Sequence, residues 1–209
     1  MRASGPRVSL RRSKPLMKRQ PAASPLYTIG HSTRSLRELI DVLRAFEVTR
    51  LVDIRSIPRS HANPQFNADV LPAALHDAGI TYVLLPALGG RRSKVKEVAE
   101  SVNAGWRLRA FHNYADHAET AVFLEGLREL LAMASRETCA IMCAEAVWWR
   151  CHRRIVTDHV LAHGVPVIHL FTTTKAEPAT LTPFARIGAH GAVSYPAQLI
   201  PLRDRPRRG

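Results

Sequence analysis

Residues 26–54 read LYTIGHSTRSLRELIDVLRAFEVTRLVDI, which is a strand pattern, a helix pattern and a second strand pattern in succession. A short apolar run that ends at Gly30 is typical of a buried strand. Ser35 and Glu38 have the spacing of a capping box, in which each side chain bonds the backbone N–H of the other residue. Apolar residues then recur at helical spacing, and residues 51–54 follow as a second apolar run. The stretch therefore predicts a β-α-β unit.

The same alternation continues along the rest of the chain. Four further helices are expected, with apolar faces or stripes over residues 70–78, 94–102, 123–134 and 152–163. Asn67 is expected to cap the first of them. Further strands are expected at 80–85, 139–143 and 165–170. Right-handed crossovers place helices on both faces of a mostly parallel sheet. We therefore expect a three-layer α/β fold with an open sheet of about five strands and helices on both faces.

Length and composition favour one folded domain between two tails. With 209 residues and 46% hydrophobic content, the chain can build a real core, which we place in a single α/β domain at 25–202. Residues 1–24 are rich in Arg, Ser and Pro and are expected to be a disordered basic tail, and residues 203–209 a second basic tail. Residues from Thr172 onward are irregular, and either an edge strand or a mobile flap over a pocket fits them.

The net charge of +13 is concentrated in the tails. Residues 1–24 carry +7 and residues 203–209 carry +3, which leaves +3 on the body. Such tails neutralise phosphates without reading sequence, so weak nucleic-acid contact is expected there. No apolar run approaches the roughly 18 residues that a membrane helix needs, so no membrane partner is expected.

The three cysteines favour a reducing, cytoplasmic location, because they are crowded into residues 139–151 rather than spaced as a disulfide framework. The N-terminal segment lacks the apolar core of a secretory signal, although its Arg- and Ser-rich character also suits an organelle transit peptide. The oligomeric state is left open.

Polar residues follow the predicted strands repeatedly. They lie in the segments 28–32, 53–59, 88–92 and 143–145, and residues 151–154 open the next helix. Open parallel sheets bind ligands beyond the carboxyl ends of their strands. We therefore expect one pocket at this edge of the sheet.

An ordered set of short motifs runs through the same segments. They are Thr28-Ile-Gly-His-Ser32, Asp53 with Arg55-Ser56 and Pro58, Pro64 with Phe66-Asn67, Leu88-Gly-Gly-Arg-Arg92, Tyr114-Ala-Asp116, Cys143-Ala-Glu145 and Cys151-His-Arg153. In this order they resemble the Domain of Unknown Function 488 family over about residues 27–170. The resemblance implies no settled activity. Trp148 stands where many relatives have proline, which implies a less rigid loop before Cys151.

The residue types in these segments favour binding of an anion, so a small anionic or phosphorylated ligand is the expected partner. Gly30 would let the backbone approach a ligand, and the helix after His31 and Ser32 would direct its free N–H groups and its positive dipole end at that ligand. The guanidinium groups expected to hold phosphate or carboxylate belong to Arg55, Arg91 and Arg153. The alternative is that the arginines are solvated or are paired with Asp53, Asp116 and Glu145.

Cys143 and Cys151 are candidate nucleophiles. A cysteine at a helix start beside histidine and arginine is expected to have a lowered thiol pKa. The arginine six residues onward that a phosphatase-type loop requires is absent after both. Glu145 beside His152 or His31 is a candidate general acid or base, and an ordering ion pair is the alternative.

No cofactor and no stoichiometric metal are expected, because the cysteines and histidines lack the spacing of known metal motifs. The aromatic residues close to arginines, Trp106, Phe111, Tyr114, Trp148 and Trp149, suit either base stacking or core packing.

The leading hypothesis is an enzyme on a phosphorylated, nucleotide-like or nucleic-acid-derived substrate. Its proposed catalytic residues are Glu145, Cys143, Cys151 and His152, supported by Asp53, Tyr114 and Asp116. The alternatives are a non-catalytic nucleic-acid-binding module and a sensor of a small anion.

Overall fold

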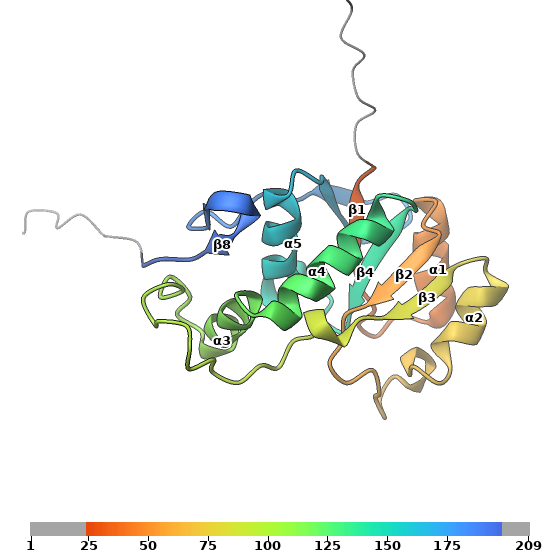
Figure 1. Cartoon of the computed structure of the whole chain (residues 1–209). Coiled ribbons are helices and arrows are strands. Elements are labelled where there is room, and N and C mark those ends of the chain that lie inside the picture. The colour runs from red at the N-terminus through yellow and green to blue at the C-terminus, as the bar shows by residue number, and fades with distance from the viewer. Residues whose placement is uncertain (1–23, 198–209) are drawn as a thin grey trace, which may run out of the picture.

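The computed structural model describes residues 24–197, in which strands and helices alternate as the sequence predicts (Figure 1). In chain order the main elements are β1 (Leu26–Gly30), α1 (Leu36–Ala45), β2 (Arg50–Asp53), α2 (Leu71–Asp77), β3 (Thr81–Leu84), α3 (Arg109–Ala118), α4 (Ala121–Ala134), β4 (Cys139–Cys143), α5 (Arg153–Ala162), β5 (Val167–Leu170), β6 (Ala176–Pro178), β7 (Arg186–Ile187) and β8 (Val193–Ser194). The two basic tails were expected at residues 1–24 and 203–209, and apart from residue 24 they lie outside the described residues.

The central sheet has six strands in the order β3-β2-β4-β1-β5-β6. Strands β1 to β5 pair in parallel, and β6 joins β5 antiparallel at the edge. Figure 1 shows α4 and α5 on one side of the sheet and α1 and α2 on the other. The three-layer, mostly parallel α/β fold is therefore confirmed.

Each face of the sheet has its own apolar core. On one face, Leu39 and Leu43 of α1 and Leu75 of α2 pack against Ile29 and Met142. On the other face, the longest helical stripe of the sequence, on α4, packs with α5 against the opposite side chains of the strands. Because both faces of the sheet are covered, the strands are apolar along nearly their whole length, and β4 is buried at every position.

Strand order determines where a crevice can open. Strand β4 lies between β1 and β2, although it begins 86 positions after the end of β2 and 109 positions after the end of β1 in the chain. The chain leaves β1 and β2 toward helices on one face, whereas it leaves β4 toward α5 on the other face. The loops after these strands therefore diverge, and such a switch point is where open α/β sheets bind ligands.

The predicted cap of α1 is confirmed. The Ser35 hydroxyl accepts from the backbone N–H of Glu38 at 3.2 Å, and the Glu38 carboxylate accepts from the backbone N–H of Ser35 at 2.6 Å. The cap predicted at Asn67 is wrong, because α2 begins at Leu71 and the Asn67 side chain accepts from the backbone N–H of Ser60 at 2.7 Å instead.

The helix predicted over 94–102 is also wrong, because tertiary contacts override its apolar spacing. The Val102 carbonyl accepts from the backbone N–H of Tyr195, and the Gly105 N–H donates to the Tyr195 carbonyl, so this segment is bonded to the C-terminal part of the described chain. A helix that the pattern did not predict, α3, follows it.

Of the two expectations after Thr172, the edge strand is confirmed as β6. No residue from Thr172 to Ala197 lines the pocket at the carboxyl ends of β1, β2 and β4, so a flap over that pocket has no support in this segment. None of the described helices is long and apolar enough to cross a membrane.

Candidate functional site

A pocket with a volume of about 630 Å³ lies beyond the carboxyl ends of β1, β2 and β4. Five segments from different parts of the sequence line it: 31–33, 55–60, 90–91, 143–145 and 150–152. Asn63 and part of α3, including Phe111 and Tyr114, complete the wall. The structure therefore brings the predicted segments together at one edge of the sheet.

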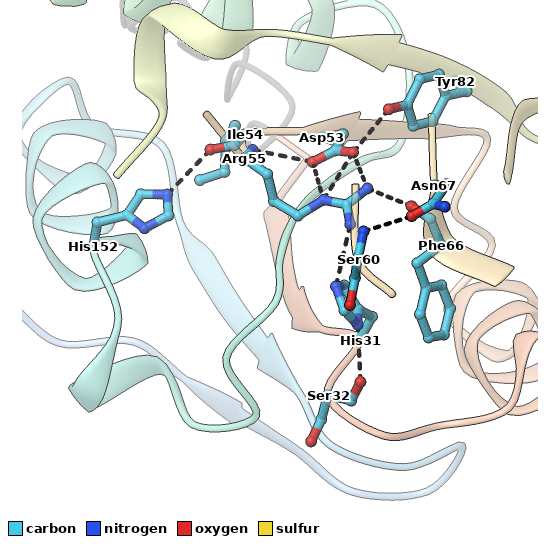
Figure 2. Close-up of polar contacts among 10 residues, drawn as sticks. All are labelled: His31, Ser32, Asp53, Ile54, Arg55, Ser60, Phe66, Asn67, Tyr82 and His152. Carbon is cyan, nitrogen blue, oxygen red and sulfur yellow. Dashed lines mark hydrogen bonds and ion pairs between the residues drawn. The ribbon is translucent and has the colours of Figure 1, made fainter. Parts of the chain in front are cut away.

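Arg55 and Asp53 form a buried ion pair at the end of β2. The Arg55 Nε donates to both carboxylate oxygens of Asp53, at 2.9 and 3.0 Å, and its Nη2 donates to the same carboxylate and to the Phe66 carbonyl. Tyr82 donates its hydroxyl to Asp53 at 2.8 Å (Figure 2). The pairing alternative considered for Arg55 is therefore present, and only its Nη1 is left to face the pocket wall.

The side chain of His31 contacts the remaining nitrogen of Arg55, Nη1. Its Nε2 lies 3.3 Å from Arg55 Nη1, and its Nδ1 lies 2.9 Å from the Ser32 carbonyl oxygen (Figure 2). A carbonyl oxygen only accepts, so Nδ1 carries the proton and Nε2 accepts from the guanidinium. Burial lowers the pKa of His31, and the positive charge of Arg55 lowers it further, so the ring is neutral at pH 7.

The two site cysteines are in contact. Cys143 ends β4 and Cys151 precedes α5, and their Sγ atoms lie 2.8 Å apart. Both are almost fully buried, yet both border the pocket. The third cysteine, Cys139, is buried at the other end of β4.

His152 is held so that one ring nitrogen faces Cys151. Its Nε2 lies 3.2 Å from the Ile54 carbonyl oxygen, and its Nδ1 lies 3.5 Å from the Cys151 sulfur. Because the carbonyl requires a donor, Nε2 carries the proton and the Nδ1 lone pair points at the thiol. The Tyr114 ring packs on the imidazole at 5.1 Å between centroids, and the backbone of Gly90 lies so close that a Cβ there would be 2.8 Å from Nδ1.

The surroundings of Cys151 favour its thiolate. Burial alone raises the pKa of this thiol, but the hydrogen bond from Cys143 and the proximity of His152 and Arg153 outweigh burial and hold its pKa well below the ordinary value. Burial raises the pKa of Cys143 well above its ordinary value, and the adjacent Cys151 sulfur adds to this. These opposite directions favour the thiolate on Cys151 and the thiol on Cys143.

Arg153 lies behind the cysteines rather than in the pocket. It is 1% exposed and donates to the Glu145 carbonyl at 2.6 Å and to the Thr28 hydroxyl at 3.4 Å. Among the described residues it has no carboxylate partner, and its Nε has no hydrogen-bond partner. A buried cation needs a counter-charge, and a Cys151 thiolate supplies one. The expected direct grip on a ligand does not fit this position, because Arg153 is buried and does not line the pocket.

Two further expectations about the anion site are corrected. Gly30 does not line the pocket, and a Cβ at this position would lie 1.9 Å from the Glu145 carbonyl oxygen, so the glycine admits the 145 loop rather than a ligand. The start of α1 is occupied by its own capping box, and the Glu38 carboxylate there would repel an anion.

The rim of the pocket carries exposed arginines. Arg91, Arg59 and Arg150 all border it, together with the backbone of Ser32. Arg59 is paired with Asp69 at 3.0 Å, whereas Arg91 and Arg150 form no ion pair with any described residue. Ser32 and Arg91 both have positive φ, at 49° and 57°, a strained conformation that is frequent at functional sites. Arg150 was not predicted, although its place two residues before His152 was a usable signal.

The remaining predicted residues have distinct positions. Glu145 borders the pocket with an exposed side chain. Tyr114 donates its hydroxyl to the Leu88 carbonyl at 2.6 Å and so holds the 88–92 loop beside His152. Asp116 lies outside the pocket, where it accepts from the Asn103 amide at 2.9 Å. Trp148 stacks on His169 with centroids 4.4 Å apart, so the loop before Cys151 is anchored without a proline.

No group of three or more His, Cys, Asp or Glu side chains in residues 24–197 is arranged to hold a metal ion. Trp106 stacks on Phe111 and packs against Tyr195, which is the core-packing alternative considered for it. Trp149 is the exposed member of the set.

The model of a family described as "Domain of unknown function DUF488" matches residues 35–160, which include Asp53, Arg55, the 88–92 loop, both site cysteines and His152. The chain belongs to this family. The family assignment made from the motifs is thus confirmed, and its name states no activity. The comparisons with curated proteins and with solved structures found no match.

Proposed function

We propose that the protein is an enzyme that uses Cys151 as a nucleophile, with His152 as its proton acceptor, on a small organic anion of the phosphorylated or nucleotide-like kind. One observation carries the proposal: the Ile54 carbonyl fixes the His152 tautomer so that Nδ1 faces the Cys151 sulfur at 3.5 Å on the pocket floor. A nucleophile and a base within reach, with the base oriented by a third group, is the arrangement that activates a thiol.

The charge of the rim supports an anionic substrate. Arg91 and Arg150 have no ion-pair partner in the described chain, and both border the cavity that contains Cys151. Exposed guanidinium groups attract carboxylate and phosphate and can grip them through two N–H donors. Glu145 is the acidic residue on this lining, so the pocket remains net positive.

Apolar groups on the same rim suit the organic part of such a substrate. Phe111 lines the pocket wall, and Ile57 borders the mouth with 61% of its surface exposed. A flat or aliphatic group can lie on these side chains while the charged group meets the arginines. In this placement the reacting atom of the substrate faces the Cys151 sulfur.

The test compares alkylation of Cys151 by iodoacetate, which is an anion, with alkylation by neutral iodoacetamide. The ratio of the two rates is expected to fall by roughly threefold to tenfold in the double variant Arg91→Gln/Arg150→Gln, because two exposed charges are removed. Arg136→Gln is the matched control, since Arg136 is an exposed arginine beyond the end of α4, outside the pocket lining. Peptide mapping identifies the modified cysteine.

An unchanged ratio in the double variant would show that the rim does not select anions. Absence of Cys151 modification at pH 7 would refute the nucleophile. A thermal-shift screen of sugar phosphates and nucleotides on the full chain then searches for the substrate, with the same double variant expected to lose any stabilisation.

A further inference from the structure

The contact between Cys143 and Cys151 supports a second chemical role for this cysteine pair, beyond activation of the Cys151 thiol. Each sulfur is positioned by a rigid element, because Cys143 ends a fully buried strand and Cys151 lies two residues before the first residue of α5. The backbone of Cys143 is bonded to His31 at 3.0 Å, and that of Cys151 to Trp148 at 3.1 Å. The sulfurs are 2.8 Å apart, so side-chain motion of less than about 1 Å would bring them to the disulfide bond length of about 2.05 Å.

The two sulfurs are chemically different. Cys151 accepts from the backbone N–H of Arg153 at 3.5 Å and lies beside His152 Nδ1, which can take the thiol proton and then carries a positive charge next to the thiolate. Cys143 lies 3.8 Å from the Glu145 carbonyl oxygen, which is an acceptor and favours the protonated thiol. This asymmetry is that of an attacking sulfur and a resolving sulfur in thiol–disulfide exchange.

We propose that Cys143 and Cys151 are a redox pair that reduces a small anionic disulfide by thiol–disulfide exchange. The proposal rests on the role of Cys151 as nucleophile given above, and it names the substrate class of the same pocket. The redox proposal gives Cys143 a chemical role. Nucleophilic catalysis by Cys151 alone would not require this second cysteine.

The exchange balances in two steps. The Cys151 thiolate, whose proton has passed to His152, attacks one sulfur of the substrate RSSR and forms an S–S bond with it. The substrate S–S bond breaks, and the other half leaves as RS⁻ and takes that proton from His152. Cys143 then attacks the Cys151 sulfur, which forms the Cys143–Cys151 disulfide and releases the second RS⁻, which takes the Cys143 proton. The two protein thiols lose two electrons, and RSSR gains them as two RSH. An added dithiol, dithiothreitol, regenerates the pair.

Oxidised glutathione is the probe, because it is a small disulfide that carries carboxylates. The full-length wild type, incubated with it at pH 7 and measured by intact mass, is expected to lose two hydrogens and to retain no glutathione, since Cys143 displaces it. Cys143→Ser is expected to trap one glutathione on Cys151. Cys139→Ser is the matched control, because Cys139 is a buried cysteine of the same strand outside the pocket, and it is expected to behave as wild type.

The charge of the substrate is tested with cystamine, a cationic disulfide of the same reaction type. Oxidised glutathione is expected to react at least about threefold faster than cystamine, and the Arg91→Gln/Arg150→Gln variant is expected to reduce this preference. Equal rates for the two disulfides would overturn the anionic substrate class. Cys143→Ala provides a second variant if Cys143→Ser fails to fold, as judged by circular dichroism.

The redox pair is overturned if the wild-type protein forms neither the internal disulfide nor a mixed disulfide with glutathione, while iodoacetamide still alkylates Cys151 rapidly. That combination leaves the nucleophile intact and removes only Cys143 from the chemistry. If iodoacetamide also fails to modify Cys151, the proposed function fails together with the redox pair. A stable glutathione adduct on the wild type would likewise refute the resolving role of Cys143.

Discussion

The imidazole of His152 donates its Nε2–H to the carbonyl oxygen of Ile54 at 3.2 Å (Figure 2). Ile54 directly follows β2, whereas His152 precedes α5, so the bond joins two elements that are 98 residues apart. It determines which ring nitrogen faces Cys151. The geometry of the site therefore depends on a backbone group that carries no chemistry of its own.

Replacing His152 by alanine is expected to slow alkylation of Cys151 by iodoacetamide at pH 7 by on the order of tenfold to a hundredfold, because the proton acceptor is lost. The difference should shrink above about pH 9, where the thiol ionises without help. Rates from peptide mapping over a pH series provide the measurement. His76→Ala, on the exposed side of α2, is the control. Equal rates for both variants at pH 7 would show that His152 is not the base.

Replacing Arg153 by methionine is expected to raise the pKa of the Cys151 thiol, since a buried positive charge beside this sulfur is removed. The pH at which alkylation reaches half its limiting rate should then rise, while the limiting rate at high pH is retained. The pH profile separates this from a merely structural role. A variant that only unfolds at lower temperature, with the profile unmoved, would contradict the prediction.

Replacing Asp53 by alanine is expected to destabilise the fold by about 3–5 kcal/mol, because it leaves the Arg55 guanidinium buried without its partner. Tyr82→Phe removes one hydrogen bond to the same carboxylate and is expected to cost only about 0.5–1.5 kcal/mol. Urea unfolding of both variants gives the comparison. Similar losses in the two would mean that the ion pair contributes no more than one neutral hydrogen bond.

Replacing Gly30 by alanine is expected to cost about 1–3 kcal/mol or more and to displace the 145 loop, because the new Cβ would lie 1.9 Å from a backbone oxygen. The displacement should also slow Cys151 alkylation, since Arg153 bonds the same carbonyl. Gly188→Ala is the matched control, as its nearest neighbour would be 3.8 Å away. If Gly30→Ala were as stable as wild type and Cys151 were alkylated as fast, the 145 loop would be able to move without affecting stability or reactivity.

Stability is expected to fall as the pH is lowered from about 6.5 to 4, because burial holds the pKa of His159 at about 3 and that of His169 at about 4. In that window the unfolded chain binds protons that the native histidines do not, so each histidine contributes up to about 3 kcal/mol of destabilisation at the lower end. Above pH 6.5 both states are neutral at these positions and the effect is absent.

The measurement is the urea midpoint at pH 7.5 and at pH 5. His159→Leu should lose less stability than wild type between these two pH values, because both ring nitrogens of His159 lack partners and its titration is removed. His76→Leu serves as the exposed control. An identical decline in wild type and His159→Leu would contradict the assignment.

Local pattern was sufficient for most elements and insufficient where long-range bonds decide the backbone. The capping box at Ser35 and the stripe of α4 are local signals, and both elements formed as predicted. Residues 94–102 have helical spacing but are bonded to Tyr195 through Val102, and such a contact has no trace in a short window of sequence. The cap expected at Asn67 was lost to a nearer competitor, because its side chain accepts from the backbone N–H of Ser60.

For the site, the sequence by itself determined which polar residues follow the strand ends, because periodicity and residue type are local properties. These residues include Cys143, Cys151, His152 and Arg55. Only the tertiary structure decided that β4 lies between β1 and β2, which brings the two cysteines into contact and the Ile54 carbonyl to the imidazole. It also decided that Arg153 is buried and bonds the Glu145 carbonyl rather than lining the pocket. Strand order and side-chain direction follow from packing of both sheet faces, and that packing is a property of the whole chain.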